Sequence, residues 1–191
     1  IDVIEPASSD ARERYATTLY ELRQRKGITL REARTHLHQP NYFGAMMVRA
    51  GDADAFVAGL TYHYPDVIRP ALEVIGPMPG VCRVAGMYVV VTADGRAVIL
   101  ADPTVNIDPS SEELATIAIM AADRAAAEFD MRPRVALLSF SNFGSTRHPR
   151  SDKVATATAL VKSRRPDLMI DGEMMADVAL RPTLRRDDYP F

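Results

Sequence analysis

The segment from residue 132 to residue 171 constrains the fold more than any other part of this chain. It reads as an apolar run (132–140), a polar loop (141–150), a helical stretch (151–165) and a second apolar run (167–171). A strand–helix–strand unit of this kind predicts two parallel neighbouring strands joined by a right-handed crossover. The sequence therefore predicts an α/β fold.

Two β-rich runs precede this unit, at residues 81–91 and 96–102, and they flank Asp94-Gly95. An Asp-Gly pair between such runs is a strong signal for a β-hairpin, because its backbone adopts the positive φ angles that tight turns need. The hairpin is expected as an antiparallel addition to the α/β fold.

Helical periodicity and capping residues predict the other elements. Thr29 with Glu32 and Ser110 with Glu113 have the spacing of capping boxes, and Pro70 is expected to disturb its helix. Helices are expected at 8–27, 30–37, 41–48, 65–76 and 111–129, and the short apolar run 54–60 is expected to form a buried strand.

Composition limits the possible partners. The chain has 191 residues, of which 47% are hydrophobic, and a net charge of −2, so no general attraction to nucleic acid or membrane is expected. The single cysteine, Cys82, excludes an internal disulfide framework and fits a cytoplasmic location. No apolar run approaches the roughly 20 residues that span a bilayer. From the two ends of the sequence we expect the chain to be a piece of a longer protein.

The polar loop 141–150 is the first candidate site, because ligands of α/β sheets bind beyond the carboxyl ends of the strands. Small hydrogen-bond donors, a glycine that allows close approach and the start of a helix suit an anion, whereas a merely solvated loop would have a similar composition. The candidate residues are Ser141, Asn142, Gly144 and Ser145.

A second cluster, Thr61, His63 and Arg69, follows the apolar run 54–60. Arg69 could bind a phosphate in bidentate fashion or pair with Asp66 three residues earlier, and a lone histidine in a turn is more often an ordinary surface residue.

A third group is acidic and comprises Asp102, Asp108, Asp171 and Glu173. No histidine joins it at ligand spacing, so we expect helix caps and turns here rather than a metal site.

Several blocks taken in order resemble a known family: GDADAFVAGL with IRPALEVIG, LADPTVNIDPSSEELATIAIMAA, PRVALLSFSNFGS and RPDLMIDGEMMADVAL. They look like successive blocks of phosphate acetyltransferases. The resemblance implies two α/β subdomains with a cleft between them, similar to isocitrate and isopropylmalate dehydrogenases, and a homo-oligomer, a dimer or larger. Residues 1–191 would be part of one such domain. Residues 1–60 would contribute to one subdomain and 61–180 mainly to the other, with the C-terminal remainder missing.

The resemblance also implies roles for individual residues. Arg69 matches an arginine that meets a phosphate or CoA oxygen, while Thr61 and His63 match a turn across the cleft. Asn106 and Asp108 match a nearby acidic strand end. The loop residues Ser141, Gly144 and Ser145 match a phosphate or acyl-phosphate loop. No catalytic residue is assigned within the chain.

Local differences point to a subtype. Tyr64-Pro65 and Phe143 depart from the pattern of active acetyltransferases, and the chain looks most like the C-terminal region of bacterial NADP-dependent malic enzymes. That reading predicts an acetyl-CoA-sensing or acetyl-phosphate-sensing module that also aids assembly. NADP and a divalent metal, Mg or Mn, would bind in an absent part. The alternatives are an active phosphate acetyltransferase and a purely structural unit.

Overall fold

The computed structural model describes residues 2–79, 81 and 83–191, so Cys82 lies outside the described residues. Contacts between residues divide the chain into two compact units, residues 1–82 and residues 83–191. The expected division of a complete domain into two subdomains at residues 60 and 61 stays a prediction.

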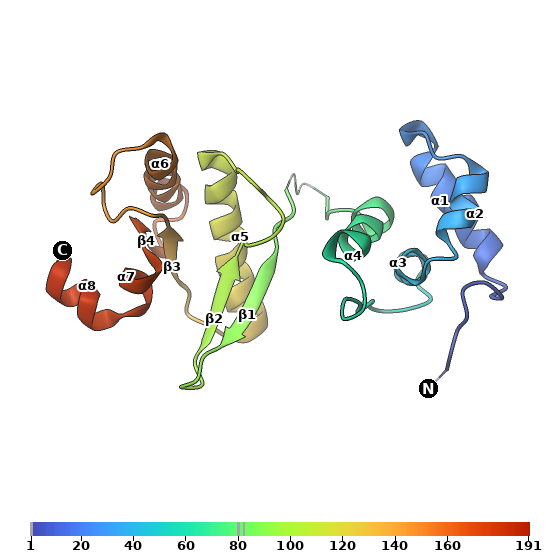
Figure 1. Ribbon diagram of the computed structural model, residues 1–191, viewed down its shortest axis with the longest axis horizontal. Coiled ribbons are helices and arrows are strands. Elements are labelled where there is room, and N and C mark those ends of the chain that lie inside the picture. Colours follow the sequence, from blue (N-terminus) through green and yellow to red (C-terminus); the bar gives the residue numbers. More distant parts are fainter. Residues whose placement is uncertain (1, 80, 82) are drawn as a thin grey trace. The chain divides into compact units, whose positions relative to one another are not determined.

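The first unit is helical (Figure 1). Its core contains Leu19, Leu37 and Met46, which are fully buried, and an edge-to-face pair of Tyr15 and Phe43 with ring centres 5.2 Å apart. The elements are α1 (Arg12–Arg23), the 3₁₀ turn η1 (Gln24–Lys26), α2 (Leu30–His36), α3 (Pro40–Ala50), α4 (Tyr64–Pro70) and the π-helical turn η2 (Ala71–Ile75).

Capping and proline chemistry set the ends of these helices. Thr29 and Glu32 form the predicted capping box at the start of α2. Gly51 ends α3 at a φ of 77°, a left-handed conformation that glycine adopts without steric cost. The predicted helix 65–76 is present, and the expected disturbance at Pro70 takes the form of the π-helical turn that follows it.

The predicted buried strand at residues 54–60 is wrong. The segment is irregular, and Val57 has 94% of its surface exposed. Phe56 is half-buried, and its ring packs against Gly44 of α3. A short apolar run becomes a strand only when another strand offers backbone partners, and the described part of this unit contains no strand.

The second unit confirms the α/β prediction. The hairpin β1–β2 is antiparallel, with Val89 opposite Ile99, and β3–β4 is the predicted parallel pair joined through α6. The elements are β1 (Met87–Val91), β2 (Ala97–Ala101), α5 (Ser111–Phe129), β3 (Arg134–Leu138), α6 (Pro149–Arg164), β4 (Met169–Met174), α7 (Ala176–Leu180) and α8 (Pro182–Asp188).

The core of the second unit lies between α5, α6 and the parallel strands (Figure 1). Small side chains of α5, among them Ala115 and Ala118, pack with Val161 of α6 and Ile170 of β4. Ser110 and Glu113 form the predicted capping box at the start of α5. These contacts hold the end of β3, and with it the polar loop, on a packed framework.

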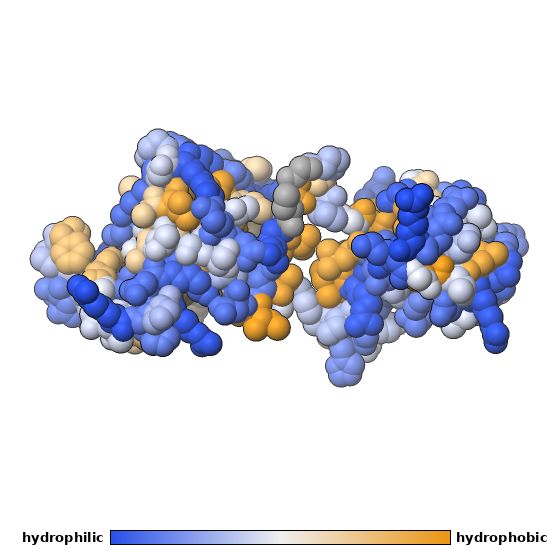
Figure 2. Space-filling view, turned by 90° about the horizontal axis from the view of Figure 1, so that it is seen from above, coloured by the Kyte–Doolittle hydropathy of each residue, from blue (hydrophilic) through white to orange (hydrophobic). Residues whose placement is uncertain are grey.

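Apolar side chains reach the surface of both units (Figure 2). In the hairpin, Tyr88, Val89, Val90 and Val91 are all exposed, although the sequence of this strand is almost entirely apolar. None of the helices in the described part of the chain is long and apolar enough to cross a membrane.

Candidate functional site

The polar loop follows β3 and leads into α6, as the sequence predicts. Ser141 is its buried anchor, with 1% of its surface exposed. The Ser141 hydroxyl donates to Oε1 of Glu173 at 3.0 Å and accepts the backbone N–H of Thr146 at 3.1 Å. The loop is therefore folded around a serine that points inward rather than toward solvent.

The other loop residues complete this network. The Ser145 hydroxyl accepts the N–H of Asn142 at 3.0 Å and lies 3.3 Å from the hydroxyl of Ser141. The amide oxygen of Asn142 accepts the N–H of Met175 at 2.7 Å, which ties the loop to the end of β4. Gly144 has a φ of 83°, and its N–H donates to Glu173 at 2.6 Å. The structure thus brings Ser141, Asn142, Gly144 and Ser145 together.

Glu173 joins this loop through an irregularity in β4. Leu137 pairs with Gly172 and Leu138 pairs with Met174, so Glu173 is an extra residue in the parallel ladder. A bulge of this kind re-aims a side chain, and the Glu173 carboxylate turns onto the loop. From the sequence, Glu173 is predicted only as one of the residues that make caps and turns. Its contacts join residues about thirty positions apart, which no local pattern reveals.

Asn106 is held by Asp102 in the turn after β2. Asp102 accepts the N–H of Gly86 at 2.8 Å and the N–H of Asn106 at 2.8 Å, and its carboxylate also accepts the Asn106 side-chain amide. Burial raises the pKa of Asp102, but the hydrogen bond from Asn106 and the backbone N–H groups outweigh it and leave this pKa below its usual value. Asn106 is thus a structural part of the turn.

Asp108 lies beside α6. Its carboxylate pairs with Lys153 at 2.5 Å, and this hydrogen bond, aided by the charges of Lys153 and Arg150, lowers the pKa of Asp108. Asp108 is exposed, and its negative charge lies near Arg150 in the first turn of α6. Its charge is therefore balanced by cations of α6.

The structure places the second predicted cluster on the surface of the first unit. Thr61, His63 and Arg69 are all exposed, and His63 begins α4 as its N-terminal flanking residue. Among the described residues, Arg69 forms no ion pair with Asp66, so that alternative is wrong. These three residues belong to the first unit, and the polar loop belongs to the second.

An interacting group of three side chains in the first unit, Tyr42, Glu73 and Arg23, was not predicted from the sequence. The Tyr42 hydroxyl donates to Glu73 at 2.7 Å, and Arg23 pairs with the same carboxylate at 3.5 Å. Burial, followed by the hydrogen bond to Glu73, raises the pKa of Tyr42 far above its usual value, while the charges of Arg69 and Arg23 oppose that shift. Both guanidinium groups therefore lie within electrostatic reach of the Tyr42 hydroxyl.

Unsatisfied polar atoms accompany this group. Nε of Arg23 and Nδ1 of His36 are buried without a hydrogen-bond partner, and the His36 ring stacks on Tyr42 with ring centres 4.6 Å apart. Buried polar atoms nearly always have a partner, so these two atoms are exceptions in the first unit. The signal in the sequence was weak, because Arg23 lies within an ordinary helical pattern.

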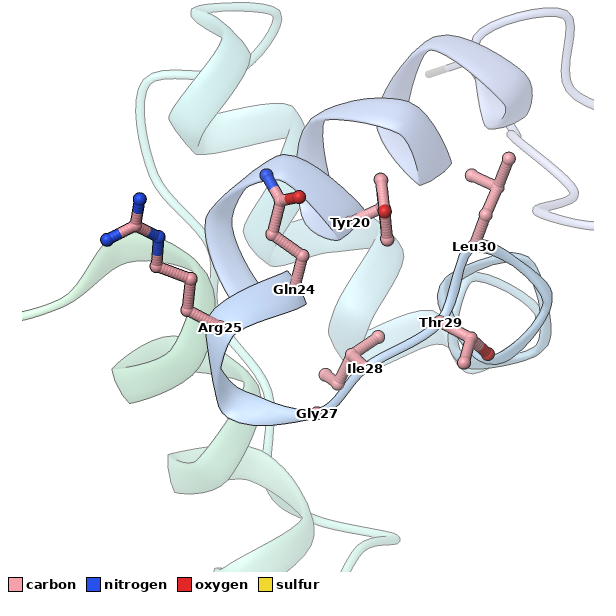
Figure 3. Close-up of a pocket in the computed structure, with 7 residues that line it drawn as sticks. All are labelled: Tyr20, Gln24, Arg25, Gly27, Ile28, Thr29 and Leu30. Atoms are coloured by element: carbon pink, nitrogen blue, oxygen red, sulfur yellow. The ribbon is translucent and has the colours of Figure 1, made fainter.

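An open groove with a volume of about 500 Å³ lies elsewhere, at the end of α1. It is lined by Tyr20, Ile28 and neighbouring residues, and Figure 3 shows Arg25 extending away from Thr29 and Leu30. The polar side chains that line the groove do not converge on one point, so we assign no ligand to it. No group of three or more His, Cys, Asp or Glu side chains that could hold a metal is present in the part of the chain that the structure describes.

Comparison with known proteins adds the family. The chain is 41% identical over 184 residues to a phosphate acetyltransferase of Thermoanaerobacterium thermosaccharolyticum, covering 94% of this chain and 56% of that protein. It is also 38% identical over 190 residues to an NADP-dependent malic enzyme of Escherichia coli, covering 99% of this chain and 25% of that enzyme. The first of these matches spans about half the length of its relative.

Solved structures agree. A phosphotransacetylase from Streptococcus pyogenes superposes with a TM-score of 0.83 at 36% identity, over 97% of this chain and 56% of that one. The fold described above thus matches about half of that phosphotransacetylase structure. The family model for phosphate acetyl/butaryl transferase matches residues 1–191. The chain therefore belongs to the phosphate acetyl/butaryl transferase family.

Proposed function

We propose that this chain is part of a phosphate acetyltransferase, which moves an acetyl group between CoA and phosphate. The observation that carries this proposal is the family match over residues 1–191. It is supported by the similar curated proteins, most of which are phosphate acetyltransferases. In this reaction the CoA thiol loses its proton and attacks the acetyl carbonyl, a C–S bond forms, the C–O bond to phosphate breaks, and the leaving phosphate takes up the proton.

The charges of the first unit fit the anionic parts of these substrates. Arg69 is exposed, and it lies with Arg23 in the electrostatic surroundings of Tyr42. A guanidinium group binds phosphate oxygens through two parallel hydrogen bonds, which fixes position as well as charge. We assign Arg69 and Arg23 to the phosphate groups of acetyl phosphate or CoA, with Thr61 and His63 at the edge of the same site.

The polar loop places small polar side chains on a rigid framework. A loop held in place before the reaction can position an acetyl group for attack. The Ser145 hydroxyl is the exposed polar group of this network. We place the acetyl group of the substrate against Ser145 and Gly144.

The test is acetyl transfer by the intact natural protein. Acetyl phosphate and CoA are supplied, and formation of the acetyl-CoA thioester is followed by its absorbance. Arg69→Ala should lower the rate at low substrate by about 10- to 100-fold, because a charged hydrogen bond is worth about 1.5–3 kcal/mol. The matched control is Arg31→Ala, an exposed arginine on α2 of the same unit, which should leave the rate unchanged. A wild-type protein without acetyl transfer would reject the proposal.

A second candidate function is favoured by the similarity to the malic enzyme. Under it, the chain is a module at the C-terminal end of an NADP-dependent malic enzyme that binds acetyl-CoA or acetyl phosphate and forms a homo-oligomer. Pro65 occupies the first turn of α4, where its missing N–H is tolerated, and Tyr64-Pro65 lacks the two hydroxyl donors of active acetyltransferases. The loss of these donors favours binding without transfer.

This candidate has its own assay. NADP-dependent malate oxidation by the intact protein is measured with Mg²⁺ or Mn²⁺, in the presence and absence of acetyl-CoA. A regulatory module requires a ligand with different affinities for two states of the whole protein, so malate oxidation should change on addition of acetyl-CoA. Acetyl transfer without malate oxidation would leave the first proposal in place.

A further inference from the structure

The buried carboxylate of Glu173 occupies the polar loop in the manner of a bound anion. Only 3% of Glu173 is exposed. Its Oε1 atom accepts the Ser141 hydroxyl at 3.0 Å and the Gly144 N–H at 2.6 Å. A hydroxyl and a glycine amide that converge on one oxygen are the groups that a phosphate oxygen would otherwise take.

The remaining donors inside the loop are also committed. The Thr146 N–H donates to Ser141, and the Asn142 N–H donates to Ser145. The Ser145 hydroxyl lies within hydrogen-bond distance of the Ser141 hydroxyl. It can donate to Ser141, because the Ser141 O–H already donates its hydrogen bond to Glu173. The network therefore runs from the exposed Ser145 hydroxyl inward to the Glu173 carboxylate. Few hydrogen-bond donors on the inner side of the loop remain free for a ligand.

No cation balances Glu173 among the described residues. The neighbouring carboxylate on the same strand, Asp171, pairs with Lys162 at 2.9 Å, whereas Glu173 is satisfied by hydroxyl and amide donors only. An anion placed on Gly144 and Ser145 would lie close to the buried negative charge of Glu173. Like charges at such separations repel appreciably when one of them is buried.

We infer that Glu173 is a specificity-determining residue that holds the place of an anion on the loop 141–146, so that the loop receives the uncharged acetyl end of the ligand and not its phosphate. The inference rests on the proposed function, since it assigns the two ends of that ligand. This reverses the expectation that the loop binds phosphate.

Glu173→Gln tests the role of the charge. A glutamine has nearly the same shape, and its side-chain oxygen can still accept from Ser141 and Gly144. The loop also keeps two contacts that do not use this side chain, from the Phe143 N–H to the Glu173 carbonyl at 2.8 Å and from the Met175 N–H to Asn142. Loss of the charge should therefore leave the loop in place.

The experiment measures binding of inorganic phosphate to the intact protein by calorimetry. We expect Glu173→Gln to bind phosphate about tenfold more tightly than the wild type. The matched control is Asp171→Asn, which removes one negative charge from the same strand without touching the loop and should leave phosphate affinity unchanged. Should Glu173→Gln fail to fold, Glu173→Ala removes the same charge and gives the same comparison.

Unchanged or weaker phosphate binding in Glu173→Gln overturns the inference, and so does an equal gain in Asp171→Asn. Absence of phosphate binding in both wild type and variant also overturns it, because the charge would then not be what keeps the anion away. Failure of the proposed function is read separately, as the absence of acetyl transfer in the wild type, and it does not alter the ratio of the two phosphate affinities.

Discussion

Ser141 and Glu173 should be energetically coupled, and the structure gives the size of the effect. Ser141→Ala removes the hydroxyl that Glu173 accepts and the acceptor of the Thr146 N–H. Water can replace the partner of Thr146, which is exposed, but not that of the buried carboxylate. Leaving a buried polar group unsatisfied costs about 1–3 kcal/mol, so we expect a loss of about 2 kcal/mol in the free energy of unfolding.

The double variant Ser141→Ala with Glu173→Gln isolates the coupling between the Ser141 hydroxyl and the charge of Glu173, because the glutamine oxygen still accepts from Ser141. Once the Ser141 hydroxyl is gone, the charge on Glu173 has lost a partner and its removal costs less. The two single costs should therefore exceed the cost of the double variant by about 1 kcal/mol. A control cycle pairs Glu173→Gln with Ser163→Ala, an exposed serine of α6, and its costs should add.

The assay is hydrogen exchange of the β3 and β4 amides at increasing urea, followed by mass spectrometry of the intact protein. It reports local free energies, which suits a chain with two compact units that need not unfold together. Additive costs for Ser141→Ala and Glu173→Gln would refute the reasoning, because the charge of Glu173 would then add nothing to its hydrogen bond with Ser141.

Three further predictions follow from the fold. Ser110→Ala breaks the capping box with Glu113 and should destabilise α5 by about 1 kcal/mol, measured as faster amide exchange in its first turns; unchanged exchange would contradict the cap. Leu19→Ala should cost about 3 kcal/mol, because Leu19 is fully buried, and urea unfolding should show the loss in the first unit. Asp108 has a pKa below its ordinary 3.8, so its pairing with Lys153 stabilises the fold above that pH and is lost as pH falls through the lowered pKa. Lys153→Met should raise the pKa of Asp108, as followed by the NMR shift of its carboxyl carbon, and an unmoved pKa would exclude the ion pair.

Local chemistry made much of the fold predictable. The Asp94-Gly95 turn places the hairpin, and the capping boxes at Thr29 and Ser110 place two helix starts, because each signal involves residues only a few positions apart. The parallel pairing of β3 and β4 also follows from the order of elements, since a helix between two strands returns the chain in the same direction.

Features that depend on distant residues were not predictable. The run 54–60 has the composition of a buried strand, yet whether it pairs depends on strands elsewhere in the chain. The position of Glu173 on the loop depends on a bulge opposite Leu137 and Leu138, and nothing in the local sequence announces that bulge. Arg23 likewise gained its place beside Tyr42 only through the packing of α1 and α3 with the turn Ala71–Ile75.

Because of the π-helical turn after Pro70, the position of the Glu73 carboxylate depends on the exact number of residues in this helix. A π turn carries one more residue than an α-helical turn, so it rotates everything after it by about 100° relative to a regular helix. Glu73 lies within this turn, and its carboxylate meets both Tyr42 and Arg23. A deletion of one residue between Ala71 and Ile75 would restore a regular helix and turn Glu73 away from both partners. The number of residues between Arg69 and Gly76 therefore matters to side chains on two other helices. A relative with one residue fewer before Glu73 would lose the pairing that Glu73 makes with Tyr42 and Arg23.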